Sequence, residues 1–230
     1  MAVLEFCKLI KIHFLTPLIL ALAAYLVTDK TLFHPIFDGI LTMASVLVCC
    51  RLLVFLYSKK EKIVHPIEKW IYIIGYIILP FIIITKIPIG VDGYNPKILI
   101  GIFILIWTND TFAYLVGKNF GKHKLFERIS PKKTIEGFIG GFLFSLIASY
   151  LIAKYFIETS NIPIWIGIAI LVSIFATLGD LIQSKFKRLA NVKDSGKVMP
   201  GHGGVLDRLD SIIFVSPFIF LFFQLLKYVS

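Results

Sequence analysis

Seven apolar stretches run along the chain, separated by shorter polar segments. They cover residues 9–27, 40–57, 71–87, 98–116, 138–157, 163–182 and 211–229. A helix of about 20 apolar residues crosses the hydrocarbon core of a bilayer, and each stretch comes close to that length. The pattern therefore predicts an all-α integral membrane protein, a polytopic bundle of about seven transmembrane helices. The first stretch continues through Val27, which favours a retained helix over a cleaved signal peptide.

Composition supports this class. Of the 230 residues, 57% are hydrophobic, whereas globular domains hold about 45–50%. Seven spans leave no room for a separate soluble domain, so we expect one membrane domain over 1–230. Its N-terminal helices occupy 1–97, and its core occupies 98–230 with two polar connections, 118–137 and 183–210. The three cysteines show no spaced pattern and are expected to be small buried hydrophobic residues: Cys7, Cys49 and Cys50.

Positive charge alternates along the connections between the stretches. The net charge is +10, and most lysines and arginines outside the stretches fall in 59–69, 118–133 and 185–208. Cytoplasmic connections of membrane proteins carry such an excess. We therefore predict a cytoplasmic N-terminus, with both long basic connections on the cytoplasmic side. The same rule explains the charge without nucleic acid, and we expect no nucleic-acid partner.

Two carboxylates lie where a membrane span should exclude them. Asp110 interrupts the fourth stretch, and Asp180 stands near the end of the sixth. A charge at the centre of a membrane helix costs about 2.5–3.5 kcal/mol even on lenient scales, so such residues usually face a cavity, a partner or an ion. The alternative is a helix-end residue that reaches water. Asp180, Ser184 and Lys187 follow at i, i+4 and i+7, with Arg188 beside the last, and would share one helix face.

Residues 184–210 form the most polar part of the chain. Asp207 and Asp210 are spaced i, i+3 at the start of the seventh stretch. Acids in a first helical turn can simply cap the helix. They can also bind Mg²⁺, which prefers oxygen ligands and often uses one or two carboxylates together with phosphates.

Three glycines surround His202 in the sequence Gly201-His202-Gly203-Gly204. Glycine allows the backbone to approach a ligand closely. His202 is either a polar loop residue or a group that contacts a ligand. Lys193 either pairs with its neighbour Asp194 or binds a phosphate.

The earlier basic connection holds the sequence Ser130-Pro131-Lys132-Lys133-Thr134. Serine followed by proline is typical of a helix start, with Ser130 as N-cap and Pro131 as the first helical residue. A helix N-terminus with two lysines is a natural anion site. The alternative is an ordinary capped start. Gly137 and Gly141, four residues apart, favour close packing against another helix.

These motifs together closely resemble the signature of the phosphatidate cytidylyltransferases, or CDP-diacylglycerol synthases. The resemblance covers about 107–210. The residues that carry its main block are Ser184, Lys187-Arg188, Lys193-Asp194, Pro200–Gly204, Asp207-Arg208 and Asp210. The residues that carry a second block are Asn109-Asp110, Ala113-Tyr114 and Ser130–Gly137.

The resemblance implies an integral membrane enzyme that transfers the cytidylyl group of CTP to phosphatidic acid. The products are CDP-diacylglycerol, a precursor in phospholipid biosynthesis, and pyrophosphate. The resemblance also implies Mg²⁺, with K⁺ as a second metal, around the aspartates that match Asp180 and Asp207. It further implies the bacterial cytoplasmic membrane, an active site that faces the cytoplasm, and a homodimer. Residues 98–230 would then be the catalytic core.

Roles follow from the chemistry of this reaction. The lipid phosphate is already an anion and attacks the α-phosphorus of CTP, so fixed cations and metal ions matter more than a nucleophile with its base. We expect the catalytic residues to be Asp180, Asp207, Asp210, Lys187 and His202, with Asp180 and Asp207 as metal ligands. We expect the substrate-binding residues to be Ser184, Arg188, Lys193, Arg208, Ser130, Lys132, Lys133, Thr134 and Asp110.

Other functions fit the residues less well. A related CTP-dependent enzyme could act on an ether lipid or a polyprenol, because headgroup residues do not distinguish lipid tails. A CDP-alcohol phosphotransferase needs a longer aspartate motif than Asp207-x-x-Asp210, which Ser-Ile-Ile follows here. An ion transporter would place acids deep in several spans. A passive anionic-lipid-binding protein would explain the lysines but not the glycine-rich turn beside two aspartates.

Overall fold

The computed structural model describes residues 1–30, 35–59, 65–90, 93–196, 198 and 203–229. They form two compact units. One unit combines residues 1–86 with 182–230, and the other comprises residues 87–181. Six helices are long and apolar enough to cross a membrane within the described residues, and a shorter apolar helix precedes them. The expected all-α integral membrane protein is confirmed.

The first unit begins with two helices in place of one continuous span. Helix α1 (Ala2–Ile10) is capped at its C-terminus by Lys11, whose backbone is left-handed, and α2 (Leu15–Lys30) follows. The expected single span over 9–27 is therefore wrong, because the helix is interrupted between Ile10 and Leu15. Pro17 explains the break, because in a continuous helix its ring would clash with the carbonyl of His13. Helix α2 rises about 24 Å, which is short of the ~30 Å hydrocarbon core.

Four further helical segments complete the N-terminal part of this unit. Helix α3 (Pro35–Tyr57) is followed by α4 (Pro66–Tyr72), the π-helical segment η1 (Ile73–Ile78) and α5 (Leu79–Lys86). The last three form one span. Lys86, at the end of this span, forms a buried ion pair with Asp38 of α3. Pairing is the usual state of a charge within a span.

Helix α8 (Ile162–Leu189) contributes residues to both units, because their boundary follows Leu181. Its C-terminal part is anchored in the first unit by Phe186, which is 1% exposed. The Phe186 ring centroid lies 5.1 Å from that of Phe6, 5.3 Å from that of Phe55 and 5.8 Å from that of Tyr72. Aromatic packing of this kind fixes the helix rotation. Lys187, the next residue, is thereby oriented as well.

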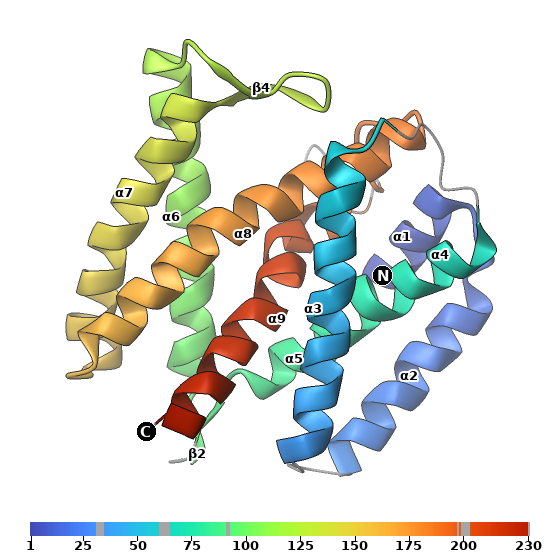
Figure 1. The fold of residues 1–230 in the computed structure, drawn as a ribbon, viewed down its shortest axis with the longest axis horizontal. Coiled ribbons are helices and arrows are strands. Elements are labelled where there is room, and N and C mark those ends of the chain that lie inside the picture. The colour runs from blue at the N-terminus through green and yellow to red at the C-terminus, as the bar shows by residue number, and fades with distance from the viewer. Residues whose placement is uncertain (31–34, 60–64, 91–92, 197, 199–202, 230) are drawn as a thin grey trace. The chain divides into compact units, whose positions relative to one another are not determined.

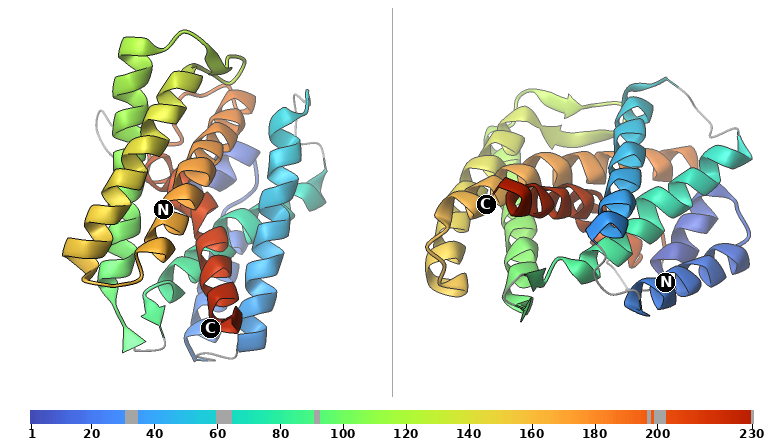
Figure 2. Two further views of the ribbon diagram at one scale, coloured as in Figure 1. Left: turned by 60° about the vertical axis from the view of Figure 1, so that its left-hand side comes forward. Right: turned by 60° about the horizontal axis from the view of Figure 1, so that its bottom comes forward.

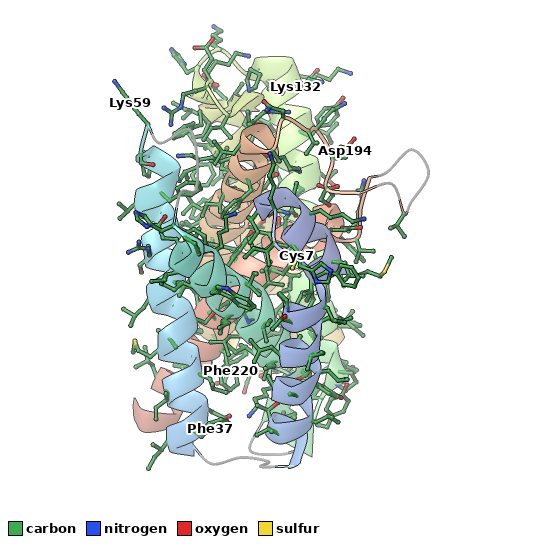
Figure 3. All side chains as sticks on the ribbon, turned by 90° about the vertical axis from the view of Figure 1, so that its right-hand side faces the viewer. Cys7, Phe37, Lys59, Lys132, Asp194 and Phe220 are labelled. Carbon is green, nitrogen blue, oxygen red and sulfur yellow. The ribbon has the colours of Figure 1, made fainter. Side chains whose placement is uncertain are left out.

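Helix α9 (Leu206–Val229) ends the first unit and packs against α3 and α5. Its Pro217 stands inside the helix, which membrane helices tolerate. In the same unit Phe37 lies near the start of α3, Lys59 lies just beyond its end, and Cys7 lies on α1 (Figure 3). Cys7 and Cys49 are buried as expected, but Cys50 is exposed.

The second unit is built on two closely packed helices. Helix α6 (Pro96–Phe120) lies beside α7 (Ile135–Leu151), which continues into the π-helical segment η2 (Ile152–Ile157) (Figures 1 and 2). Helix α6 starts with Asn95 as N-cap, whose side chain accepts a hydrogen bond from the backbone N–H of Lys97 at 3.1 Å.

Glycines make this close packing possible. A Cβ on Gly137 would lie 2.6 Å from the carbonyl oxygen of Ala113, and one on Gly141 would lie 2.7 Å from that of Asn109. The prediction that Gly137 and Gly141 serve close helix packing is confirmed.

Two short antiparallel strand pairs belong to the second unit. Strands β1 (Ile89–Gly90) and β2 (Gly93–Tyr94) precede α6. Strands β3 (Lys124–Phe126) and β4 (Ser130–Thr134) join α6 to α7, with Lys124 opposite Thr134 and Phe126 opposite Ser130. The second pair carries three basic residues of connection 118–137, which are Lys124, Lys132 and Lys133.

Candidate active site

A cavity of about 470 Å³ opens within the second unit. Helix α6, the β3–β4 pair, the start of α7 and α8 all contribute to its wall. Five predicted site residues line it together: Asp110, Lys132, Lys133, Thr134 and Asp180. The structure therefore brings together residues that lie 70 positions apart in the sequence.

Charge in this cavity is predominantly positive. Four lysines and two aspartates line it, which suits a polyanionic ligand. Lys133 forms an ion pair with Asp180, and the two side chains are 27% and 32% exposed. Asp110 lines the same cavity as this ion pair. The lining thus combines cations for phosphates with two carboxylates that can bind a cation.

The β3–β4 pair positions Lys132 and Lys133 over the cavity. Lys132 extends from this pair (Figure 3). The expected helix start at Ser130-Pro131 is wrong, because Ser130–Thr134 is extended and pairs with β3. Helix α7 instead begins at Ile135 with Thr134 as its N-cap, whose hydroxyl accepts a hydrogen bond from the N–H of Gly137 at 3.1 Å. Threonine caps a helix as serine does.

A second contact holds this hairpin on α7. The Glu136 carboxylate accepts a hydrogen bond from the backbone N–H of His123 at 3.2 Å, and its Oε1 lies 2.6 Å from His123 Nδ1. In addition, the N–H of Ile135 donates to the carbonyl of His123 at 2.9 Å. The open end of the strand pair, where β3 begins and β4 ends, is therefore fixed at the first turn of α7.

The first unit holds a polar cluster around Asp207, in the first turn of α9. Lys187 Nζ of α8 donates to Asp207 Oδ1 at 2.8 Å. Asp207 Oδ2 accepts from the N–H of Ser195 at 2.8 Å, from its hydroxyl at 3.0 Å, and from the N–H of Gly204 at 2.9 Å. These four bonds fix the orientation of the Asp207 carboxylate. Two predicted site residues, Lys187 and Asp207, are thus brought together.

The other predicted residues are placed as follows. Ser184, with Asp180 and Lys187, belongs to α8, as the i, i+4, i+7 spacing predicts. Arg188, Lys193 and Arg208 are exposed, and Asp210 is half-buried on α9. Ser130 begins β4. His202 lies outside the described residues.

Sequence reasoning missed several polar residues of both clusters. Lys118 and Lys124 line the cavity, and Lys118 Nζ lies 5.9 Å from the ring centroid of Tyr114, which also lines it. The spacing Asp110, Tyr114, Gly117 and Lys118 on one helix face could have predicted part of this wall. In the first unit, Ser195 and Glu5 were missed.

The positions of the carboxylates indicate where a metal ion could bind. Within the described ranges, no three His, Cys, Asp or Glu side chains are grouped to hold a metal ion. Asp110 and Asp180 do line one cavity. One or two carboxylates completed by substrate phosphates are the usual Mg²⁺ site, so this pair fits such an ion. Asp180 and Asp207 belong to different units, and their joint role as metal ligands stays a prediction.

Comparisons with known proteins point to one family. A model of the cytidylyltransferase family matches residues 1–226. The phosphatidate cytidylyltransferase of Staphylococcus aureus (strain COL) is 55% identical over 117 residues, which are 50% of this chain and 44% of the relative. Proteins of the same name from Staphylococcus haemolyticus and Staphylococcus saprophyticus are 52% and 51% identical, with the same coverage. The matched region is therefore less than half the length of these curated relatives.

Proposed function

Because this chain belongs to the cytidylyltransferase family, we propose that it transfers the cytidylyl group of CTP to phosphatidic acid. The products would be CDP-diacylglycerol and pyrophosphate. The observation that carries the proposal is the cavity of the second unit, where four lysines and two aspartates meet at membrane-spanning helices. The name shared by the Staphylococcus relatives supports the choice of lipid.

The lysines of the cavity would bind the triphosphate. Lys133 would leave Asp180 for a phosphate oxygen, because a polyphosphate presents more negative charge than one carboxylate. Lys118, Lys124 and Lys132 would add further cations around the same anion. Their main effect is to bring two negatively charged substrates together.

The reaction itself forms one P–O bond and breaks another. An oxygen of the lipid phosphate attacks the α-phosphorus of CTP, and the bond from that phosphorus to the oxygen bridging to the β-phosphorus breaks. The electron pair leaves with pyrophosphate. The attacking oxygen is already an anion near neutral pH, so no side chain has to remove a proton. Catalysis then depends on positioning and on stabilising charge.

Asp110 and Asp180 are the residues of the cavity that would hold Mg²⁺, with Asp207 as the further ligand predicted from the resemblance. When bound, Mg²⁺ would neutralise charge on the phosphates and on the departing pyrophosphate. Lys187, paired with Asp207 at 2.8 Å, would contribute a phosphate-binding cation in the first unit. K⁺ as a second metal stays a prediction.

Membrane placement is part of the proposal. The chain is an integral membrane protein, and we place it in the bacterial cytoplasmic membrane with its active site facing the cytoplasm, where CTP is made. The basic connections support this orientation. A homodimer, which the resemblance implies, also stays a prediction.

Labelled CTP tests the function directly. Purified protein in phospholipid micelles should convert CTP and phosphatidic acid to CDP-diacylglycerol with Mg²⁺, and EDTA should stop the reaction. Asp180→Asn should lower kcat by about 100-fold or more, as loss of a group that stabilises transition-state charge does. The matched control is Glu158→Gln, whose side chain is 73% exposed.

Two outcomes would contradict the proposal. Turnover that persists in EDTA would exclude the metal role. A faster reaction with an ether-lipid phosphate or a polyprenyl phosphate in the same assay would assign the chain to the alternative substrate class.

A further inference from the structure

Glu5 is a buried carboxylate at the N-terminus of α9. It stands on α1, far from α9 in the sequence, and is 4% exposed. Its Oε1 accepts a hydrogen bond from the N–H of Val205 at 3.1 Å, and its Oε2 accepts one from the N–H of Leu206 at 2.7 Å. The first N–H groups of a helix lack intrahelical acceptors, and a negative charge there is favoured by the helix dipole. Glu5 therefore caps α9 from another helix.

The Asp207 carboxylate is also bound by backbone N–H groups. The N–H groups of Ser195 and Gly204 donate to Asp207 Oδ2. The Ser195 hydroxyl lies 3.0 Å from Glu5 Oε2 and also 3.0 Å from Asp207 Oδ2. Because a hydroxyl has one proton, it donates to one carboxylate at a time. The two carboxylates thus share Ser195.

Glycines let the backbone close around these carboxylates. A Cβ on Gly204 would lie 2.4 Å from Glu5 Oε2, and one on Gly196 would lie 2.5 Å from Glu5 Oε1. Gly203 has a φ of 85°, and its Cβ would lie 2.8 Å from Asp207 Oδ2. A Cβ at any of these positions would displace the Glu5 or the Asp207 carboxylate from its place. Gly203 and Gly204, the described glycines of the motif, therefore leave room for the Asp207 and Glu5 carboxylates.

We propose that Glu5 is a positioning residue for Asp207. By holding Val205 and Leu206, Glu5 fixes the first turn of α9, so that Asp207 Oδ2 stays with the backbone N–H groups and Oδ1 stays with Lys187. It acts through the backbone and Ser195 and touches no substrate. The inference rests on the proposed function only where it concerns turnover, because the geometry of the turn can be measured without it.

Glu5→Gln is the direct test, since it keeps the shape and replaces one acceptor oxygen with an N–H₂ group. Either Val205 or Leu206 then faces a donor. Hydrogen–deuterium exchange of the intact protein should become faster in peptides that cover 203–209, whereas the rest of the chain should exchange as before. Glu158→Gln, an exposed glutamate, is the matched control and should leave the exchange of 203–209 unchanged.

Turnover provides the second readout. Glu5→Gln should lower kcat about 10–100-fold, the usual effect of losing a group that orients a functional side chain. KM for CTP should stay within about threefold, because no ground-state contact to the nucleotide is removed. Unchanged exchange and unchanged kcat would overturn the proposal. A uniform increase in exchange over all helices would assign Glu5 to general stability instead and would also overturn it.

Ser195→Ala keeps the proposal testable where Glu5→Gln does not fold. It removes the shared hydroxyl but leaves Glu5 bound to Val205 and Leu206. We expect kcat to fall while the amides of 205 and 206 stay protected, and an unchanged kcat would contradict the coupling. Failure of the proposed function can be distinguished from failure of this inference. If the wild-type chain had no cytidylyltransferase activity, hydrogen–deuterium exchange would still show whether Glu5 protects residues 203–209.

Discussion

Lysine side chains pair with two of the three aspartates that are proposed to bind metal. Lys133 pairs with Asp180 in one unit, and Lys187 pairs with Asp207 in the other. A lysine in this position balances the carboxylate charge, because an unpaired charge in a partly buried site is energetically costly. The same cation can later bind a phosphate. Such a pair therefore suits a site in which a metal ion replaces the lysine beside the carboxylate when a polyanion binds.

Lys133→Met tests this exchange at the level of one residue. It removes the cation from the cavity and leaves a side chain of similar length. We expect kcat/KM for CTP to fall roughly 10–100-fold, because a hydrogen bond to a charged group contributes about 1.5–3 kcal/mol. Steady-state kinetics with CTP as the varied substrate gives the measurement. Lys122→Met, at an exposed position of the same connection, is the control, and equal activity of the two variants would contradict the role of Lys133.

Local patterns predicted some residues of the site and missed others for a physical reason. Asp110 and Asp180 could be predicted because a charge inside an apolar stretch is costly and needs an explanation. Glu5 could not, because it lies in a short amphipathic segment where an acid is ordinary. Its partners are 190 to 201 positions away, and no pattern in one sequence reports such a contact.

At the scale of elements, the join between α6 and α7 determines the shape of the cavity. The sequence predicted close packing there from Gly137 and Gly141, and it predicted a capped helix start. It placed that start at Ser130, whereas Thr134 is the cap. The reason is competition between two local structures. Pro131 suits a first helical turn, but it also suits an extended strand, and pairing of Ser130 with Phe126 selects the strand.

Gly137→Ala tests the close packing of α6 and α7. A Cβ there would lie 2.6 Å from the carbonyl oxygen of Ala113 and 3.1 Å from the Cα of Gly117, so backbone has to move. Overpacking of this kind costs about 1–3 kcal/mol. We expect a lower thermal unfolding temperature in detergent and weaker CTP binding, because the cap at Thr134 moves with α7.

Gly39→Ala is the matched control for this substitution. Gly39 also lies in an apolar helix, but its added Cβ would meet no atom within 4 Å. Alanine has the higher helix propensity, so this variant should unfold at the same or a higher temperature. If Gly137→Ala behaved like Gly39→Ala, the packing of α6 on α7 would tolerate a methyl group, contrary to the structure.

At the scale of the whole molecule, the alternation of charge is the strongest sequence signal. In the first unit, Lys185 Nζ lies 2.8 Å from the carbonyl oxygen of Ser58, which follows the last residue of α3. The end of α3 and this part of α8 therefore lie together, and both lead into basic segments, 59–69 and 185–208. Contacts in this unit thus agree with a common side for two of the three basic connections.

Single-cysteine variants can test whether the remaining basic connection, 118–133, lies on the same side of the membrane as the other two. The native thiols give little background once Cys50 is replaced by serine, because Cys7 and Cys49 are buried. Burial also raises the pKa of the Cys7 thiol to about 11, so little thiolate is present at neutral pH. Each probe position should be exposed and outside the apolar part of its span, as Lys122, Lys193 and Glu158 are.

In intact bacteria, a membrane-impermeant maleimide should label Glu158→Cys but neither Lys122→Cys nor Lys193→Cys. After permeabilisation all three should react. The reason is electrostatic, since the connections that contain Lys122 and Lys193 carry the positive charge that membrane insertion retains in the cytoplasm. Mass spectrometry of the labelled peptides gives the fraction modified. Labelling of Lys122→Cys and Lys193→Cys from opposite sides would separate the lysines of the cavity from Lys187 and Asp207 by the bilayer, and one reaction could then not use both clusters.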